Sequence, residues 1–185
     1  MKNVLFIHAC TRPNSRTLCL SREILKKIGG KIEEVKLYET DLLPLDFEGM
    51  KKRDRAVSTQ DFSDPAFDLA KQFAAADVIV IAAPYWDLMF PSVLKIYLEA
   101  VTVCGITLDY TAEGRPQGLC RAKEVHFVTT AGGFIGENDF GFSYVKALAQ
   151  NFFGIPAVFR YAAEGLDMAG ADVDGILKKA ADLTL

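Results

Sequence analysis

An uninterrupted apolar run between Asp77 and Pro84 constrains the fold more than any other part of this chain. Its residues, Val78 to Ala83, are apolar and largely β-branched, with no alternation of polar residues. Such a run is typical of a strand buried on both faces, as in a parallel sheet covered by helices. The segments 2–9 and 123–130 have the same character. We therefore expect an α/β fold built on a parallel sheet.

Strand and helix patterns alternate along the chain. We expect strands at 2–9, 31–38, 77–83, 123–130 and 156–163, and helices at 16–28, 65–75, 91–103, 142–153 and 171–182. The second strand is charged and alternating, which places it at a sheet edge. This edge position gives the strand order 2-1-3-4-5, a flavodoxin-like, doubly wound, five-stranded parallel sheet. A long polar connection at 40–63 and a short excursion at 105–121 lie outside this pattern.

Length and composition favour a single domain spanning residues 1–185. The chain is 50% hydrophobic and 24% charged, which is ordinary for a globular domain. Its formal net charge of -3 argues against a nucleic-acid partner. The apolar run from Val4 to Ala9 is too short to cross a membrane, so we expect a cytoplasmic protein without a membrane span. Four cysteines without a Cys-x-x-Cys pair, and only two histidines, give little material for a metal site.

An aromatic loop follows the third predicted strand and ends at Pro91, which opens the next helix. Its residues are Pro84, Tyr85, Trp86, Asp87 and Leu88. Ligands bind at the carboxyl ends of the strands in open α/β sheets, so this loop is a candidate site. Ring-sized side chains suit the border of a flat cofactor, and backbone N–H groups suit its polar rim. The alternative is that the loop only packs; Trp86, the single tryptophan, is either a ring neighbour or a core filler.

The loop after the first strand is rich in hydrogen-bond donors. It supplies Thr11, Asn14, Ser15, Arg16 and Thr17 just where a helix begins. Free N–H groups and the helix dipole favour an anion there, so we expect a phosphate. Asn14 or Ser15 is also suited to simple helix capping, which is compatible with phosphate binding. His8 ends the preceding strand and is either a cofactor contact or a core histidine.

Two known nucleotide-binding patterns are missing from that loop. It has no G-x-G-x-x-G, so the dinucleotide fingerprint is absent, and no G-x-x-x-x-G-K-[ST], which excludes a P-loop NTPase.

A third loop follows the fourth strand and consists of Thr130, Ala131, Gly132 and Gly133. Paired glycines let the backbone approach something flat without interference from a Cβ, although a plain turn also explains them. Together the three loops favour a planar, phosphorylated cofactor. FMN has that shape, and a chain this short leaves little surface for the adenosine half of FAD.

These motifs resemble the flavodoxin-like NAD(P)H-dependent FMN oxidoreductases, which include FMN-dependent NADH azoreductases and NAD(P)H quinone reductases. The resemblance rests on four segments in order: the Pro84 to Lys95 spacing, Thr130 to Gly133, Gly105 to Gly114, and Phe153 to Leu166. It implies that NAD(P)H reduces the bound FMN, which then passes two electrons to a quinone or azo-type acceptor. No side chain is assigned a catalytic role.

One position departs from the family's pattern. The azoreductases commonly have Asn-Phe-Gly where this chain has Asp87, Leu88 and Met89. The Asp87 carboxylate is able to accept a hydrogen bond from the flavin imide, so we expect flavin binding to survive. A negative charge beside the ring disfavours the anionic reduced flavin, so we expect reduction to be harder. We expect Met89 to reshape the acceptor side.

The resemblance also implies a homodimer in which each subunit completes the other's flavin site. Apolar residues in surface loops commonly mark an interface, and Leu43, Leu45, Phe47, Met50 and Tyr110 lie in such loops. The alternative is that these residues fold back over their own sheet.

Two other functions remain open: a non-enzymatic flavodoxin-type electron carrier, and a flavin-binding sensor with poor turnover. The modest net charge and the 105–121 excursion argue against the carrier.

Overall fold

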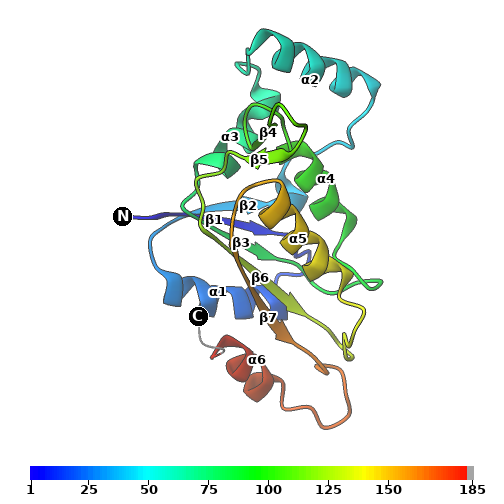
Figure 1. The fold of residues 1–185 in the computed structure, drawn as a ribbon. Coiled ribbons are helices and arrows are strands. Elements are labelled where there is room, and N and C mark those ends of the chain that lie inside the picture. Colours follow the sequence, from blue (N-terminus) through cyan, green and yellow to red (C-terminus); the bar gives the residue numbers. More distant parts are fainter. Residues whose placement is uncertain (183–185) are drawn as a thin grey trace.

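A computed structural model describes residues 1–182 of the chain (Figure 1). Its main sheet contains β2 (Lys31–Lys36), β1 (Asn3–His8), β3 (Val78–Ala82), β6 (Glu124–Thr130) and β7 (Ala157–Ala163), in that spatial order. Every neighbouring pair is parallel. This is the predicted order 2-1-3-4-5. The charged strand β2 lies at one edge, and every residue of β3 is buried, as the hydrophobic pattern predicted.

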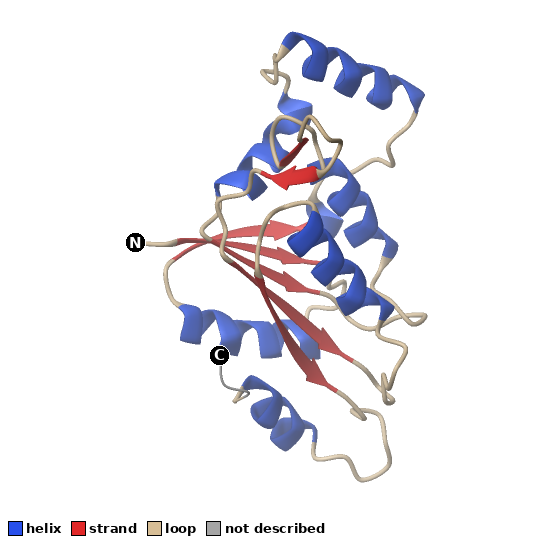
Figure 2. Ribbon diagram, viewed as in Figure 1, coloured by secondary structure: helices blue, strands red, loops and turns tan. Residues whose placement is uncertain are grey.

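Helices cover both faces of the sheet (Figure 2). One face carries α1 (Arg16–Ile28) and α6 (Val173–Ala181), and the other carries α3 (Asp68–Ala75), α4 (Ser92–Val101) and α5 (Phe140–Asn151). The alternation of side chains along each strand divides the core accordingly. In β1, Leu5 and Ile7 belong to the cluster under α3, α4 and α5, whereas Val4 and Phe6 belong to the cluster under α1 and α6.

The 40–63 segment contains a helix that the sequence prediction missed. After the short 3-10 turn η1 (Leu37–Glu39), the chain forms α2 (Phe47–Thr59), which lies at the outer end of the molecule in Figure 1. Asp46 caps α2 by accepting a hydrogen bond from the N–H of Gly49 at 2.8 Å. Ala56 is the only buried residue of α2, so the helix lacks the apolar stripe on which the prediction relied.

The 105–121 excursion forms a small antiparallel pair, β4 (Leu108–Tyr110) and β5 (Pro116–Gly118). Buried Thr107 anchors it: its hydroxyl donates to the carbonyl of Val101 at 2.7 Å and accepts from the N–H of Val103 at 3.0 Å. A Cβ at Gly118 would lie 2.1 Å from the backbone nitrogen of Gly154, so only glycine allows this close approach.

Other boundaries lie close to the predicted ones. The predicted helix 65–75 is a 3-10 turn, η2 (Pro65–Phe67), followed directly by α3. Within residues 1–182, no helix is both long and apolar enough to cross a membrane.

Candidate functional site

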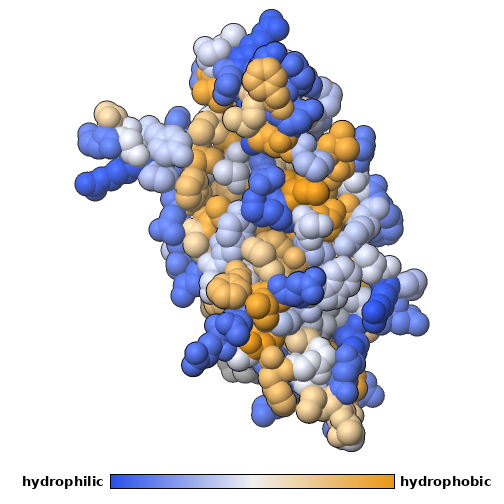
Figure 3. All heavy atoms as spheres, turned by 90° about the vertical axis from the view of Figure 1, so that its right-hand side faces the viewer, coloured by the Kyte–Doolittle hydropathy of each residue, from blue (hydrophilic) through white to orange (hydrophobic). Residues whose placement is uncertain are grey.

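Two hydrogen bonds at Thr130 join the three predicted loops at the carboxyl edge of the sheet. The Oγ1 atoms of Thr130 and Thr17 lie 2.7 Å apart, which connects the end of β6 to the start of α1. The N–H of Tyr85 donates to the carbonyl of Thr130 at 3.0 Å, which connects the aromatic loop to the same residue. The predicted loop residues therefore meet at one edge of the sheet, which faces the viewer in Figure 3.

The start of α1 retains the features expected of an anion site. Ser15 is the N-cap and accepts from the N–H of Leu18 at 3.3 Å. Among the described residues, the N–H groups of Arg16 and Thr17 have no hydrogen-bond partner. Thr11 and Asn14 are exposed beside them, whereas Thr17 is buried. Exposed donors at a helix N-terminus suit a phosphate group.

The Arg16 guanidinium reaches the loop after β7. It donates to the carbonyl of Leu166 at 3.0 Å and to Oδ1 of Asp167 at 2.8 Å. Arg16 therefore ties α1 to that loop. Burial raises the pKa of the neighbouring Cys10 thiol, against the lowering effect of Ser15 and Thr17, so the thiol stays protonated at neutral pH.

The aromatic loop makes a tight turn with an unusual backbone. The N–H and C=O groups of Trp86 and Met89 bond in both directions, at 2.9 and 2.8 Å. The two residues between them, Asp87 and Leu88, have φ of 50° and 66°. Positive φ at both central positions defines a type I′ turn, which strongly favours asparagine and glycine. Trp86 and Leu88 are 41% and 50% exposed at this turn, so Trp86 is not a core filler.

The two glycines of the third loop have different roles. A Cβ at Gly132 would lie 2.1 Å from Oδ2 of Asp167, so a larger residue there would displace the Asp167 side chain that pairs with Arg16. A Cβ at Gly133 would meet nothing within 4 Å. The outer side of Gly133 is thus open, as a flat ligand requires.

His8 lies on the α1 side of the sheet. Its ring is buried beside Phe6, with centroids 5.4 Å apart, and its Nε2 lies 3.4 Å from Oε1 of Glu34. Burial lowers the pKa of His8, although Glu34 partly opposes this effect. Among the described residues, no hydrogen bond joins this imidazole to the three loops.

Four aromatic residues follow the glycines and divide into two pairs. Phe142 and Tyr144 are partly buried and pack against the core. Phe134 and Phe140 are 74% and 55% exposed. On the carboxyl edge of the sheet, which Figure 3 shows, hydrophobic residues lie among polar ones.

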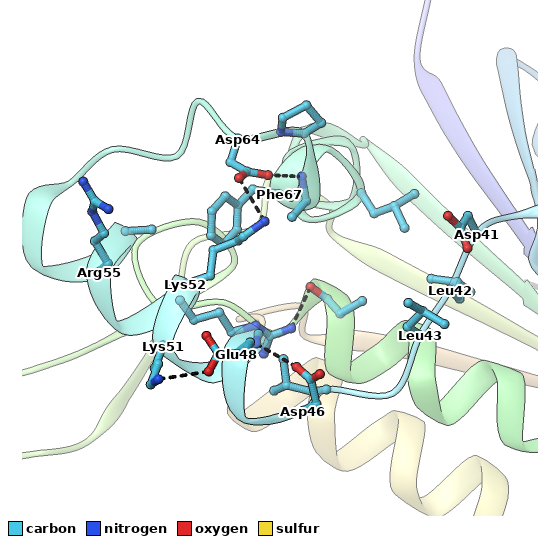
Figure 4. Close-up of a pocket in the computed structure, with 18 of the residues that line it drawn as sticks. Asp41, Leu42, Leu43, Asp46, Glu48, Lys51, Lys52, Arg55, Asp64 and Phe67 are labelled. Atoms are coloured by element: carbon cyan, nitrogen blue, oxygen red, sulfur yellow. Dashed lines mark hydrogen bonds and ion pairs between the residues drawn. The ribbon is translucent and has the colours of Figure 1, made fainter.

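A separate cavity of about 1140 Å³ lies beneath α2 (Figure 4). The segment from Thr40 to Phe67, with Leu69 and Ala100, lines it, and none of the three loops does. Arg53 crosses from α2 to the carboxyl end of α4, where it donates to the carbonyls of Glu99 at 2.7 Å and Thr102 at 3.3 Å.

A five-stranded, doubly wound parallel sheet with ligand-type loops at its carboxyl edge defines a flavodoxin-like protein. The sequence profile of a family described by its flavodoxin-like fold matches residues 2–183, so the chain belongs to that family. An FMN-dependent NADH:quinone oxidoreductase from Clostridium acetobutylicum is 36% identical, over 96% of this chain and 94% of that protein. A second one, from Clostridium beijerinckii, is 32% identical over 98% and 96%.

The fold comparison agrees with the sequence relatives. The crystal structure of an azoreductase from Bacillus anthracis superposes with a TM-score of 0.83 at 24% identity, covering 98% of this chain and 95% of that one. The resemblance inferred from the motifs is thereby confirmed at the level of family and fold.

Proposed function

We propose that this protein is an FMN-dependent NAD(P)H oxidoreductase that transfers two electrons to quinone or azo-type acceptors. The observation that carries the proposal is the junction of three loops at Thr130, in a chain related over nearly its full length to FMN-dependent NADH:quinone oxidoreductases. Because those relatives are named for NADH, NADH is the proposed donor.

The start of α1 is the proposed phosphate site. The free N–H groups of Arg16 and Thr17, with the side chains of Thr11, Asn14 and Ser15, form a donor set with a favourable helix dipole. The Thr17 hydroxyl is shared with Thr130, so its contribution is through its backbone. His8, another predicted cofactor residue, has its imidazole Nε2 3.4 Å from Oε1 of Glu34.

The aromatic and glycine loops are the proposed ring site. The open outer side of Gly133 offers a surface for a flat ring, and the strained turn at Asp87 presents Trp86 and Leu88 beside it. Pro84 and Tyr85 are half-buried, and Ala131 is buried, so these residues support the loops from below. Bound FMN would supply the redox chemistry, while the protein orients the ring and limits the access of water.

Flavin binding and reduction test this proposal directly. The purified protein, mixed with FMN and gel-filtered, is expected to be yellow and to bleach with NADH under anaerobic conditions. Added benzoquinone should restore the colour. A protein that stays colourless with FMN would overturn the proposal, and parallel incubation with FAD tests the preference for FMN. Steady NADH oxidation with menadione, without a reductase partner, distinguishes an oxidoreductase from an electron carrier or a sensor.

We further propose a two-fold symmetric homodimer whose subunits share the flavin sites. Leu43 and Phe47 are 77% and 71% exposed, and Met50 and Tyr110 are also exposed, so these side chains do not fold back over their own sheet. Leu43 also lines the cavity beneath α2, and exposed apolar side chains of this kind are suited to cover by a second copy. Light scattering on the FMN-loaded protein tests this: a monomer mass at micromolar concentration would contradict a shared site.

A cytoplasmic location is also part of the proposal. The proposed donor NAD(P)H belongs to that compartment, and Cys10, Cys19, Cys104 and Cys120 are all free, as is usual in a reducing environment. Cell fractionation followed by immunoblotting would test it.

A further inference from the structure

A single guanidinium lies between two carboxylates behind the glycine loop. Arg160, on the edge strand β7, donates from Nε to Oδ2 of Asp139 at 2.6 Å and from Nη2 to Oε1 of Glu164 at 3.0 Å. All three side chains are partly buried, with exposures of 30%, 14% and 26%. Burial alone lowers the pKa of Arg160, but the hydrogen bonds that it donates to Glu164 and Asp139 outweigh this effect, and the pKa is raised.

Each carboxylate holds one end of the segment that follows Gly133. The second oxygen of Glu164 accepts from the N–H of Ile135 at 3.0 Å. The second oxygen of Asp139 accepts from the N–H of Phe142 at 3.0 Å and so caps α5. Arg160 therefore connects the two anchors of the segment 134–140.

The aromatic loop is tied to the same segment between its anchors. The Tyr85 hydroxyl donates to the carbonyl of Asn138 at 3.0 Å. Ile135 is buried, whereas Phe134 and Phe140 are exposed at the carboxyl edge. The backbone of the segment is thus fixed from within, while its two aromatic side chains are largely exposed beside the proposed flavin site.

We propose that Arg160 is a positioning residue that sets the Phe134–Phe140 segment as the wall of the acceptor site. This inference rests on the proposed function. The planar guanidinium donates to two carboxylates at once in a fixed geometry, which a lysine ammonium does not reproduce. Without it, Asp139 and Glu164 repel each other, and both anchors of the segment loosen. Arg160 then governs acceptor affinity, while the phosphate site at α1 retains FMN.

The test compares Arg160→Gln with the matched control Arg121→Gln. Arg121 also forms an arginine–aspartate ion pair, with Asp77 at 2.7 Å. It precedes β6, however, and so lies at the amino ends of the strands, away from the candidate site. With FMN-loaded protein and saturating NADH, R160Q should raise the KM for menadione about tenfold, with a smaller change in kcat. The Kd for FMN should stay within about twofold, and R121Q should match the parent in all three.

Two further variants test the assignment to this network. Glu164→Ala removes the anchor of Ile135 directly, so it should raise the KM as R160Q does, and the double variant should add little. Arg160→Lys keeps the charge and should recover part of the affinity. If R160Q fails to fold, R160K and E164A carry the same comparison with R121Q.

Hydrogen exchange gives a readout that does not depend on activity. The amides of Ile135 and Phe142 should lose protection in R160Q and keep it in R121Q. Unchanged exchange, or a KM equal to that of R121Q, overturns the inference. An equal rise in KM and in the Kd for FMN also overturns it, since general loosening would then explain both. A parent protein that binds no FMN and reduces no menadione refutes the proposed function instead, while the exchange result still decides the role of Arg160.

Discussion

The hydroxyl of Thr17 lies 2.7 Å from the hydroxyl of Thr130, in a buried contact between the first turn of α1 and the end of β6. The two residues are 113 positions apart in sequence. This contact holds the proposed phosphate loop at a fixed position relative to the proposed ring loops, because the two hydroxyls belong to a strand of the sheet and to the helix that covers it.

Thr17→Val should therefore destabilise the protein by about 1 to 3 kcal/mol, because it leaves the buried Thr130 hydroxyl without a partner. Thr17→Val combined with Thr130→Val removes both polar groups and should recover most of that loss. Urea unfolding of the three proteins measures these differences. Equal stability of the single variant and the parent would show that the contact contributes nothing.

Tyr97→Phe should stabilise the protein by about 1 kcal/mol. The Tyr97 hydroxyl is fully buried and, within the described part of the chain, has no hydrogen-bond partner. Burial raises the pKa of this phenol, so it stays neutral throughout the usable pH range. Tyr161→Phe is the matched control, since the Tyr161 hydroxyl lies 3.3 Å from Nδ1 of His126. Because this variant loses a hydrogen-bond partner, it should be no more stable than the parent protein. Thermal unfolding of both variants checks the difference in sign.

The sheet was predictable because its order follows from local pattern. Uninterrupted apolar runs mark the central strands, and the alternating charges of β2 mark an edge. Helix α2 was not predictable in this way, because Ala56 is its only buried residue. Its stability comes from the Asp46 cap and from the Arg53 contacts to α4, which leave no periodic signal in the sequence.

The candidate site shows the same limit. The residue types of the three loops pointed to phosphate and ring contacts, but the junction at Thr130 depends on tertiary distances. Arg160, Asp139 and Glu164 resemble ordinary surface charges in the sequence, and only the fold brings them together. The positive φ of Leu88 was not predictable either, because the sequence has neither glycine nor asparagine at that position.

Arg53→Ala should loosen α2 without unfolding the sheet. The Arg53 guanidinium donates to carbonyls at the carboxyl end of α4, where a cation is also favoured by the helix dipole. Its loss should weaken the attachment of α2 by about 1 to 2 kcal/mol and speed proteolysis within the 40–64 segment. Lys51→Ala is the control, since the Lys51–Glu48 pair is exposed and surface pairs contribute little. Equal cleavage rates in the two variants would refute this attachment.

Stability should fall as the solution becomes acidic, in part because of the buried histidines. Burial lowers the pKa of His126 and of His8 against the opposing effects of Glu124 and Glu34. The unfolded chain therefore takes up protons near the ordinary histidine pKa of about 6.5, while the folded chain resists them. The stabilisation is complete above that value and is lost as the pH falls below it. Urea unfolding from about pH 7.5 to 5 measures the slope, which should flatten in a His8→Gln, His126→Gln variant if both histidines contribute.

Asp87→Asn should speed the reduction of bound FMN by NADH. The Asp87 side chain belongs to the strained turn beside the proposed ring site, and it is exposed at the sheet edge. A carboxylate there opposes the negative charge that the ring gains on reduction, by about 1 kcal/mol at short range in water. Asparagine removes the charge and tolerates the positive φ of this position, so the backbone should stay in place. Stopped-flow mixing with NADH should show an increase of about fivefold in the reduction rate, which corresponds to that energy. Leu88→Gly is the control for the turn itself, because it relieves the strain at φ 66° without changing the charge. If D87N and the parent are reduced equally fast, the charge of Asp87 does not limit the reaction.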